Sequence, residues 1–114
     1  MTLLEQLNTA LAPLDIPIET GIFSEAAPDE YIVIVPLSDT YDVHADNQPQ
    51  VNIEEARIAL FSKNNYTTAK NAIVRTLLAG EFTITARHYI GFETETGYHH
   101  YNVDVAQYYE MEES

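Results

Sequence analysis

The stretch of residues 66–79 constrains the fold of this chain more than any other. Its apolar side chains recur at the spacing of one face of an α-helix, at Tyr66, Ala69, Ile73 and Leu77. The runs before and after it, 51–62 and 82–92, instead alternate with the period of two that is typical of strands. A helix between strands in a chain of 114 residues indicates one domain, residues 1–114, that contains both kinds of element.

The remaining elements are expected from the same patterns. A first helix is predicted over residues 2–12, because Thr2 and Glu5 fit a capping box and Pro13 ends the helix. Strands are predicted at residues 16–23, 31–35, 51–62, 82–92 and 98–109. The order α-β-β-β-α-β-β predicts an α+β fold, in which two helices cover one face of a mainly antiparallel sheet of four to five strands.

Local signals predict where these elements end or bend. The run 31–35 is apolar on both faces, so we expect it to be covered on both sides and closed by Pro36. In the following strand the apolar phase slips near Glu54 and Glu55, which predicts a β-bulge or a bend. Gly80 lies where a left-handed helix cap is expected. The next strand is expected to bury one face, formed by Phe82, Ile84, Ala86, Ile90 and Phe92.

Acidic residues dominate the first half of the chain. Residues 1–56 contain 11 of the 18 acidic residues and no Lys or Arg, and the whole chain has a net charge of -13. Binding of nucleic-acid phosphates needs clustered basic residues, so it is not expected. Residues 38–50, with Asp39, Asp42 and Asp46, are expected to form a long acidic loop that is functional or mobile. The acidic surface has three interpretations: solubility, docking on a basic partner, or a wall that repels DNA.

The sequence contains no recognisable catalytic or cofactor motif. Without cysteine, the chain has no thiol nucleophile, disulfide or cysteine zinc site. The acidic pairs 29–30 and 54–55 lack a second convergent group in the sequence, so we expect neither enzyme activity nor a cofactor. No window approaches the roughly 18 consecutive apolar residues of a membrane helix, so no membrane association is expected.

The histidines of the last hairpin are the only candidates for metal ligands. His99 and His100 are adjacent on a predicted strand and therefore point to opposite faces. His100 could approach His88 across the hairpin, with Asp104 or Glu93 as a third ligand. We prefer the interpretation that these are hydrogen-bonded strand histidines, and no metal site is expected.

Tyrosine is enriched, with eight in the chain and four of them in the last strand. Its apolar ring and polar tip favour protein interfaces, and a half-exposed strand face is the alternative explanation. Tyrosines and acidic residues together form the set of candidate oligomer or partner-interface residues: Asp39, Asp42, Asp46, Glu54, Glu55, Tyr98, Tyr101 and Tyr108.

Two segments resemble a known family. Residues 58–66, Ile-Ala-Leu-Phe-Ser-Lys-Asn-Asn-Tyr, run from a strand into a helix as in small phage tail proteins. Residues 92–105, Phe-Glu-Thr-Glu-Thr-Gly-Tyr-His-His-Tyr-Asn-Val-Asp-Val, resemble the final hairpin of the same proteins. The family is the tail terminator, also called tail completion or minor tail protein, of long-tailed non-contractile bacteriophages and their prophages. The resemblance covers residues 51–109.

The resemblance implies a structural protein of the virion tail that is made in the bacterial host cytoplasm. Family members cap the finished tail tube as a ring, usually of six subunits, and join it to the connector of the capsid. The implied partners are further copies of the chain, the tail tube protein and the head–tail connector protein. DNA passes through the ring without specific binding, and no catalytic residues are carried over. The acidic segments would then face the hole or a neighbouring subunit.

Two other functions remain open at this point. One is a head-side neck or head–tail connector protein of the same kind of virus. The other is a cytoplasmic adaptor or inhibitor that mimics nucleic acid with its acidic face. Observation of a closed ring would distinguish the virion assembly proteins from the acidic adaptor or inhibitor. Each subunit of a ring needs two different complementary patches.

Overall fold

The computed structural model describes residues 3–19, 28–43 and 49–110, with the backbone alone described at 38–43, 49–52 and 109–110. Its elements in chain order are α1 (Leu3–Leu11), a 3-10 turn η1 (Ala12–Leu14), β1 (Ile18–Glu19), β2 (Glu30–Val43), β3 (Pro49–Ser62), α2 (Tyr66–Ala79), β4 (Thr83–Phe92) and β5 (His99–Glu110). This is the expected order with one added 3-10 turn.

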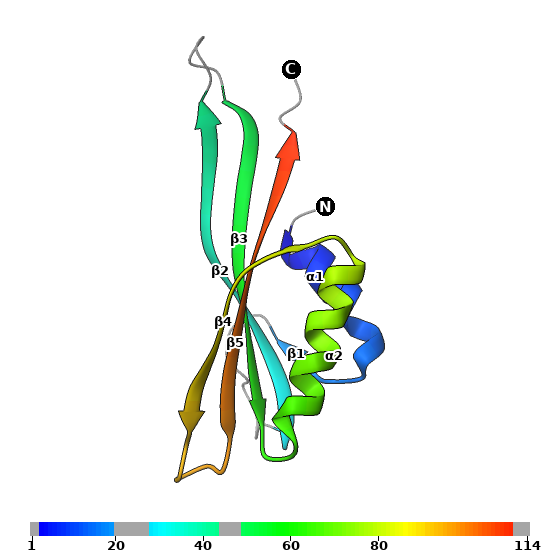
Figure 1. Cartoon of the computed structure of the whole chain (residues 1–114), viewed down its shortest axis with the longest axis vertical. Helices are drawn as coiled ribbons and strands as arrows, with labels where there is room; N and C mark the ends of the chain where they lie inside the picture. The colour runs from blue at the N-terminus through cyan, green and yellow to red at the C-terminus, as the bar shows by residue number, and fades with distance from the viewer. Residues whose placement is uncertain (1–2, 20–27, 44–48, 111–114) are drawn as a thin grey trace.

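The strands form a five-stranded sheet in the order β1-β2-β3-β5-β4. The short β1 runs parallel to β2, and the other three pairs are antiparallel. Both helices lie on the same face of this sheet (Figure 1). The α+β fold class is therefore confirmed. Among the described residues no helix is both long and apolar enough to cross a membrane.

The core lies between the two helices and the face of the sheet that they cover. Strand residues alternate between the two faces, so every second side chain of the central strands points toward the helices. The largest fully buried side chains of the helices are Leu3, Leu7, Leu11, Ile73 and Leu77. They pack against buried strand residues of the same cluster, which include Ile32, Ile34, Ile58, Leu60, Val103 and Val105.

Strand β2 is longer and less covered than the sequence indicates. Ile32 and Ile34 are buried, but Val35 is 39% exposed, so the expectation of cover on both faces was wrong. Pro36 does not close the strand either, because pairing with β3 resumes after a bulge at Leu37. Proline is tolerated there because the described residues place no strand on the outer side of β2 at this level.

The expected acidic loop at 38–50 is mostly strand. Residues 38–43 and 49–50 belong to β2 and β3, which form one long hairpin, and residues 44–48 lie outside the described part of the chain. These residues form strands despite their polar composition because β2 and β3 pair with each other. An antiparallel ladder satisfies the hydrogen-bonding groups of the backbone whatever the side chains are. Of the expected strand at 16–23, the structure describes residues 16–19, and only Ile18 and Glu19 among them are strand. Thr2 of the expected capping box is not described.

The phase slip near Glu54 and Glu55 coincides with a bulge, but the bulge is in the partner strand. Leu37 of β2 is the extra residue, between the pairs that join Pro36 to Ala56 and Ser38 to Glu55. Strand β3 itself pairs with β5 without interruption from Val51 to Ser62. The sequence thus indicated the correct level of the sheet and the wrong strand.

Helix α2 ends in a Schellman motif that uses Glu81 rather than Gly80. The amide of Glu81 donates to the carbonyl of Leu78, and the amide of Phe82 donates to that of Leu77 at 3.0 Å. Glu81 has the left-handed φ of 63°, whereas Gly80 has a φ of -85°, so the expectation for Gly80 was wrong. Gly80 is favoured for a different reason: an added Cβ would lie 3.0 Å from the Phe82 ring, which would have to shift.

We predict that Leu77→Ala lowers the free energy of unfolding by about 2–5 kcal/mol, because Leu77 is fully buried between α2 and the sheet. The neighbouring Leu78 is 59% exposed and provides a matched control. Leu78→Ala should cost less than about 0.5 kcal/mol. Urea unfolding of both variants measures the difference, and equal losses would contradict this helix face.

We also predict that Glu81→Gly raises the free energy of unfolding by about 1 kcal/mol, because glycine adopts the left-handed region without the Cβ clash. Gly80→Ala is the counterpart and should lower it by about 1 kcal/mol through the close contact with Phe82. Thermal or urea unfolding reports both signs. A loss of stability in Glu81→Gly would show that the backbone strain is not relieved.

Candidate functional site

The far ends of β2, β3 and β5 project beyond the two helices (Figure 1). We call this projection the arm, and it comprises residues 39–43, 49–53 and 108–110. The arm makes the molecule elongated, with extents of 53 × 25 × 24 Å. Helices cover neither face of the arm, and its described side chain at Tyr108 is exposed to other molecules.

The expected interface residues of the first half lie in or beside the arm. Asp39 and Asp42 are strand residues of β2, and their backbones pair with Glu54 and Val51 of β3. Asp46 lies outside the described residues. Tyr108 in β5 is 57% exposed and pairs with Ile53. The structure therefore brings acidic residues and an exposed tyrosine together at one end of the sheet.

Glu54 has a structural contact at the base of the arm. Its carboxylate accepts a hydrogen bond of 3.2 Å from the backbone amide of Leu3, at the first turn of α1. A carboxylate there satisfies a free amide and is favoured by the helix dipole. Glu54 thus fixes the start of α1 to the sheet. Glu55, on the opposite face of β3, is half-buried and pairs with Ala106 of β5.

Tyr98 belongs to a packed aromatic cluster on the face that the helices leave open. It is buried, and its hydroxyl donates to the carbonyl of Pro28 at 2.5 Å. Its ring meets those of Tyr31 and Phe61 edge to face, with centroid distances of 5.4 and 6.2 Å. Lys63 lies over the ring at 4.9 Å. The hydroxyl anchors the chain before β2, so Tyr98 is a structural residue in this fold rather than an exposed partner contact.

A second aromatic cluster lies on the helix side of the same hairpin. Tyr66 of α2 faces Tyr89 and His99 at 5.1 and 5.0 Å between ring centroids. Tyr101 packs partly buried beneath α2, with the Lys70 ammonium 5.4 Å from its ring. Phe92 contacts His99 at 4.9 Å but remains 52% exposed. This cluster joins α2 to the β4–β5 hairpin and extends to its surface.

The histidines are placed on opposite faces, as expected for neighbours in a strand. The ring of His99 is 3.0 Å from the Tyr89 hydroxyl, and His100 stacks on Phe61 at 4.3 Å. His100 also makes a hydrogen bond of 2.8 Å to Asn102. Within the described residues no three histidine or acidic side chains are grouped as a metal site would require.

The open face of the sheet also contains the best-formed ion pair of the described residues. Arg57 of β3 and Asp104 of β5 pair in register, and the guanidinium donates to both carboxylate oxygens at 2.9 and 3.1 Å. The hydrogen bonds and charge of Asp104 raise the pKa of Arg57 above its usual value. Asp104, one of the possible metal ligands, is therefore already neutralised by Arg57.

Strand β4 exposes apolar residues that the alternating pattern assigned to the core. Bulges at Thr85 and at Ile90 each insert one residue opposite β5. The first bulge moves Ala86 to the open face, and the second restores Phe92 to the helix side, near the end of the strand. Ile90 is 54% exposed and Tyr89 is 45% exposed, so the expectation of one buried face fails after Ile84.

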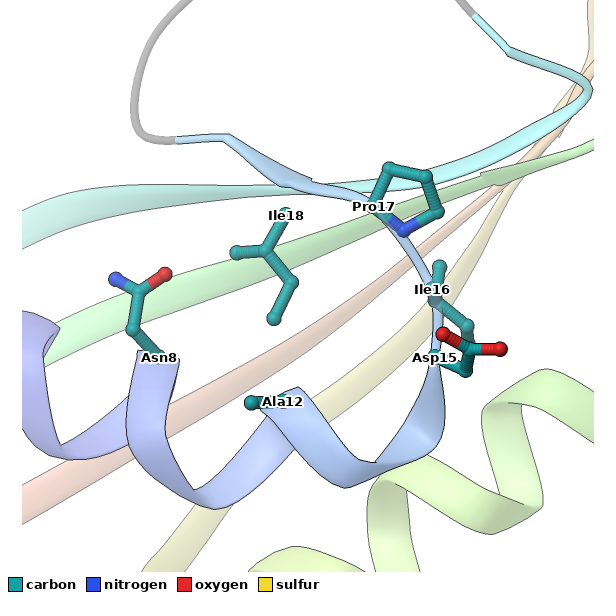
Figure 2. A pocket seen from close by; sticks show the side chains of 6 residues that line it. All are labelled: Asn8, Ala12, Asp15, Ile16, Pro17 and Ile18. Carbon is teal, nitrogen blue, oxygen red and sulfur yellow. The ribbon is translucent and has the colours of Figure 1, made fainter.

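A shallow hollow lies between the end of α1 and strand β1 (Figure 2). It has a volume of about 360 Å³ and is lined by Asn8, Ala12, Asp15, Ile16, Pro17 and Ile18. The amide of Asn8 is engaged with the carbonyl of Leu4 at 2.9 Å. The lining offers one carboxylate and no basic side chain, so it does not contain a general acid–base pair.

Comparison of the chain with protein-family models and with curated proteins gave no match.

Two features of these surfaces were not visible in the sequence, and a third had a signal that could have found it. The pairing of Arg57 with Asp104 depends on the register between β3 and β5, which the sequence does not specify. The exposure of Ile90 depends on two bulges without a sequence signal of their own. The contact of Glu54 with α1 had a signal, since a polar residue interrupts the apolar phase at that point.

We predict that Tyr31 contributes to alkaline unfolding. Its pKa is raised, first by burial and then by the nearby Tyr98 and Glu93. The unfolded chain ionises this phenol at lower pH than the folded chain, so the stabilisation is complete below pH ~10 and is lost as the pH rises through the folded pKa.

Tyr31→Phe should therefore reduce the loss of stability above pH ~10. Tyr108→Phe removes the same hydroxyl from an exposed position in the arm and is the matched control. Urea unfolding at several alkaline pH values measures the slope. Identical slopes in the Tyr31→Phe variant and the unmodified chain would contradict this role.

Proposed function

We propose that this chain is a virion assembly protein that caps the end of a phage tail tube as a ring and joins the tube to the head connector. The observation that carries the proposal is the resemblance of residues 58–66 and 92–105 to tail terminator proteins. These two segments belong to β3, α2, β4 and β5, which are consecutive in the chain and packed together. A ring of six subunits follows from the resemblance alone.

Two structural features support a role in assembly. The arm extends strands beyond the helices, as a protein that must contact a tube or a connector needs. The sheet also ends in two different edges, β1 with the adjoining part of β2 and, opposite, β4. A closed ring requires two unlike complementary surfaces on each subunit, and these edges are candidates for them.

The charge of the chain suits a passage for DNA. With a net charge of -13, a ring of these subunits would repel phosphates rather than bind them. DNA could then pass through the hole without being held. The proposal includes no catalytic step and no cofactor, and it places the protein in the virion tail after synthesis in the host cytoplasm.

An acidic adaptor or inhibitor that mimics nucleic acid is the second candidate. The observation that favours it is the absence of any Lys or Arg from residues 1–56, which contain β1 and β2. Such a protein would act as a monomer on a basic partner. A head-side neck protein is the other alternative, and it would bind the connector without capping the tube.

The test is the addition of purified chain to tail tube protein of the same phage, with tube growth and tube ends observed by electron microscopy. We expect a ring at the tube end and no further growth when more tube protein is added. Tyr108→Ala in the arm should raise the concentration needed for capping about tenfold if this tyrosine is an interface anchor.

Thr9→Ala is the control, since it also truncates an exposed side chain but lies on α1, outside the arm. It should leave capping unchanged. Binding to the connector without any effect on tubes would favour the neck protein. Binding to neither, with a monomer at all concentrations, would favour the acidic adaptor.

A further inference from the structure

The two outer edges of the sheet differ in charge. Helix α2 and strand β4 contain Lys70, Arg75 and Arg87 and no acidic residue. Strands β1 and β2, at the opposite side of the sheet, contain four acidic residues and no basic one: Glu19, Glu30, Asp39 and Asp42. Glu81 and Glu93 lie just before and just after β4, and Asp39 and Asp42 lie in the arm beyond the level of Thr83. Within the element bounds, the α2–β4 side is therefore the cationic edge and the β1–β2 side is the anionic edge.

Two of the three basic residues of the cationic edge are available for a partner. Arg75 and Arg87 are exposed, and neither makes an ion pair within the described part of the chain. Strand β4, which contains Arg87, also exposes the apolar side chains of Tyr89, Ile90 and Phe92. A surface that combines free guanidinium groups with exposed aromatic and aliphatic side chains is typical of a protein interface.

Among the described residues, both edges also offer unpaired backbone. Strand β4 pairs with β5 on one side, and the described residues place no strand on its other side. Strand β1 covers β2 only at Ile32 and Val33, so the outer side of β2 beyond them faces no described strand. Val35 and Leu37, in this uncovered part, are 39% and 41% exposed. An open edge with exposed apolar residues can accept a further strand.

Strand direction makes the two edges compatible. Pairing is antiparallel from β2 to β3, from β3 to β5 and from β5 to β4, so β4 runs opposite to β2. A second copy placed beside the first in the same orientation would therefore set its β2 antiparallel to β4. The register through β3 and β5 puts Val35 of β2 at the level of Ala86 of β4.

We propose that the partner of the β4 edge is a second copy of this chain, bound through the outer side of its β2 in an antiparallel, head-to-tail contact. The anionic β1–β2 edge of one copy faces the cationic α2–β4 edge of the next, and the antiparallel sheet continues across the interface. Repetition of this contact extends the assembly, and its closure into a ring rests on the proposed function.

The absence of cysteine allows a direct test, because introduced thiols are the only ones in the chain. The double variant Val35→Cys/Thr85→Cys has one thiol on each edge, at neighbouring levels of the sheet. A short bis-maleimide linker should convert it into a ladder of dimers, trimers and larger species. Each single variant should stay monomeric, and an equimolar mixture of the two should give dimers only.

Thr9→Cys/Thr85→Cys is the matched control, with one thiol moved to an exposed position on α1. It should give no ladder. Dimers from Thr85→Cys alone would mean symmetric pairing of two β4 edges and would overturn the proposal. The absence of a ladder from Val35→Cys/Thr85→Cys would overturn it as well.

The charge contribution is tested by adding Arg87→Glu to the double-cysteine variant. This change should lower the yield of the ladder about tenfold, whereas Arg87→Lys should preserve it. An unchanged yield with Arg87→Glu would contradict the charge complementarity of the contact. Circular dichroism of each variant verifies that the fold is intact.

The test separates this inference from the proposed function. If the chain caps tubes but the double-cysteine variant gives no cross-linked ladder, the head-to-tail contact alone is overturned. A ladder from a chain that does not cap tubes would overturn the tail function alone and leave the contact standing.

Discussion

The pairing of β3 on both sides is the interaction on which the rest of the structure depends. Strand β3 is paired with β2 and with β5 along nearly its whole length, so it joins the two halves of the chain. Its residues Ala56, Ile58 and Leu60 form the floor on which the helices pack. Helices of 9 and 14 residues are too short to be stable alone in water, so they form because this floor exists.

The same strand explains why one end of the molecule is covered and the other is not. From Leu60 back to Ala56 the inward residues of β3 are apolar. At Glu54 a carboxylate takes the inward position and accepts a hydrogen bond from the first described amide of α1. The helix layer therefore begins at the level of Glu54. Beyond it the arm is held by backbone pairing between β2, β3 and β5, which suffices for three strands attached to a packed domain.

The parts of the fold that were predictable from the sequence are those set by local pattern. Helix α2 has the predicted bounds because its periodicity is regular and Asn65 caps it, with a hydrogen bond from the amide of Thr67. The arm was not predictable, since polar residues at 38–43 become a strand only through pairing with β3. The candidate interface residues also differ in how far the sequence could predict them. The exposure of Tyr108 agrees with the prediction made from the tyrosine enrichment. The burial of Tyr98 depends on a contact with Pro28, 70 residues away in the chain.

An exposed edge strand is a liability for a protein that must remain a monomer, and natural sheets usually protect such edges with charges, bulges or cover. Strand β4 has two bulges and Arg87, which limit unspecific pairing, yet it retains exposed Tyr89 and Ile90. Net repulsion between chains of charge -13 opposes random association further. A contact between the cationic edge of one copy and the anionic edge of the next replaces part of this repulsion by local attraction. The charge distribution that disfavours aggregation therefore also selects a single orientation for the next copy.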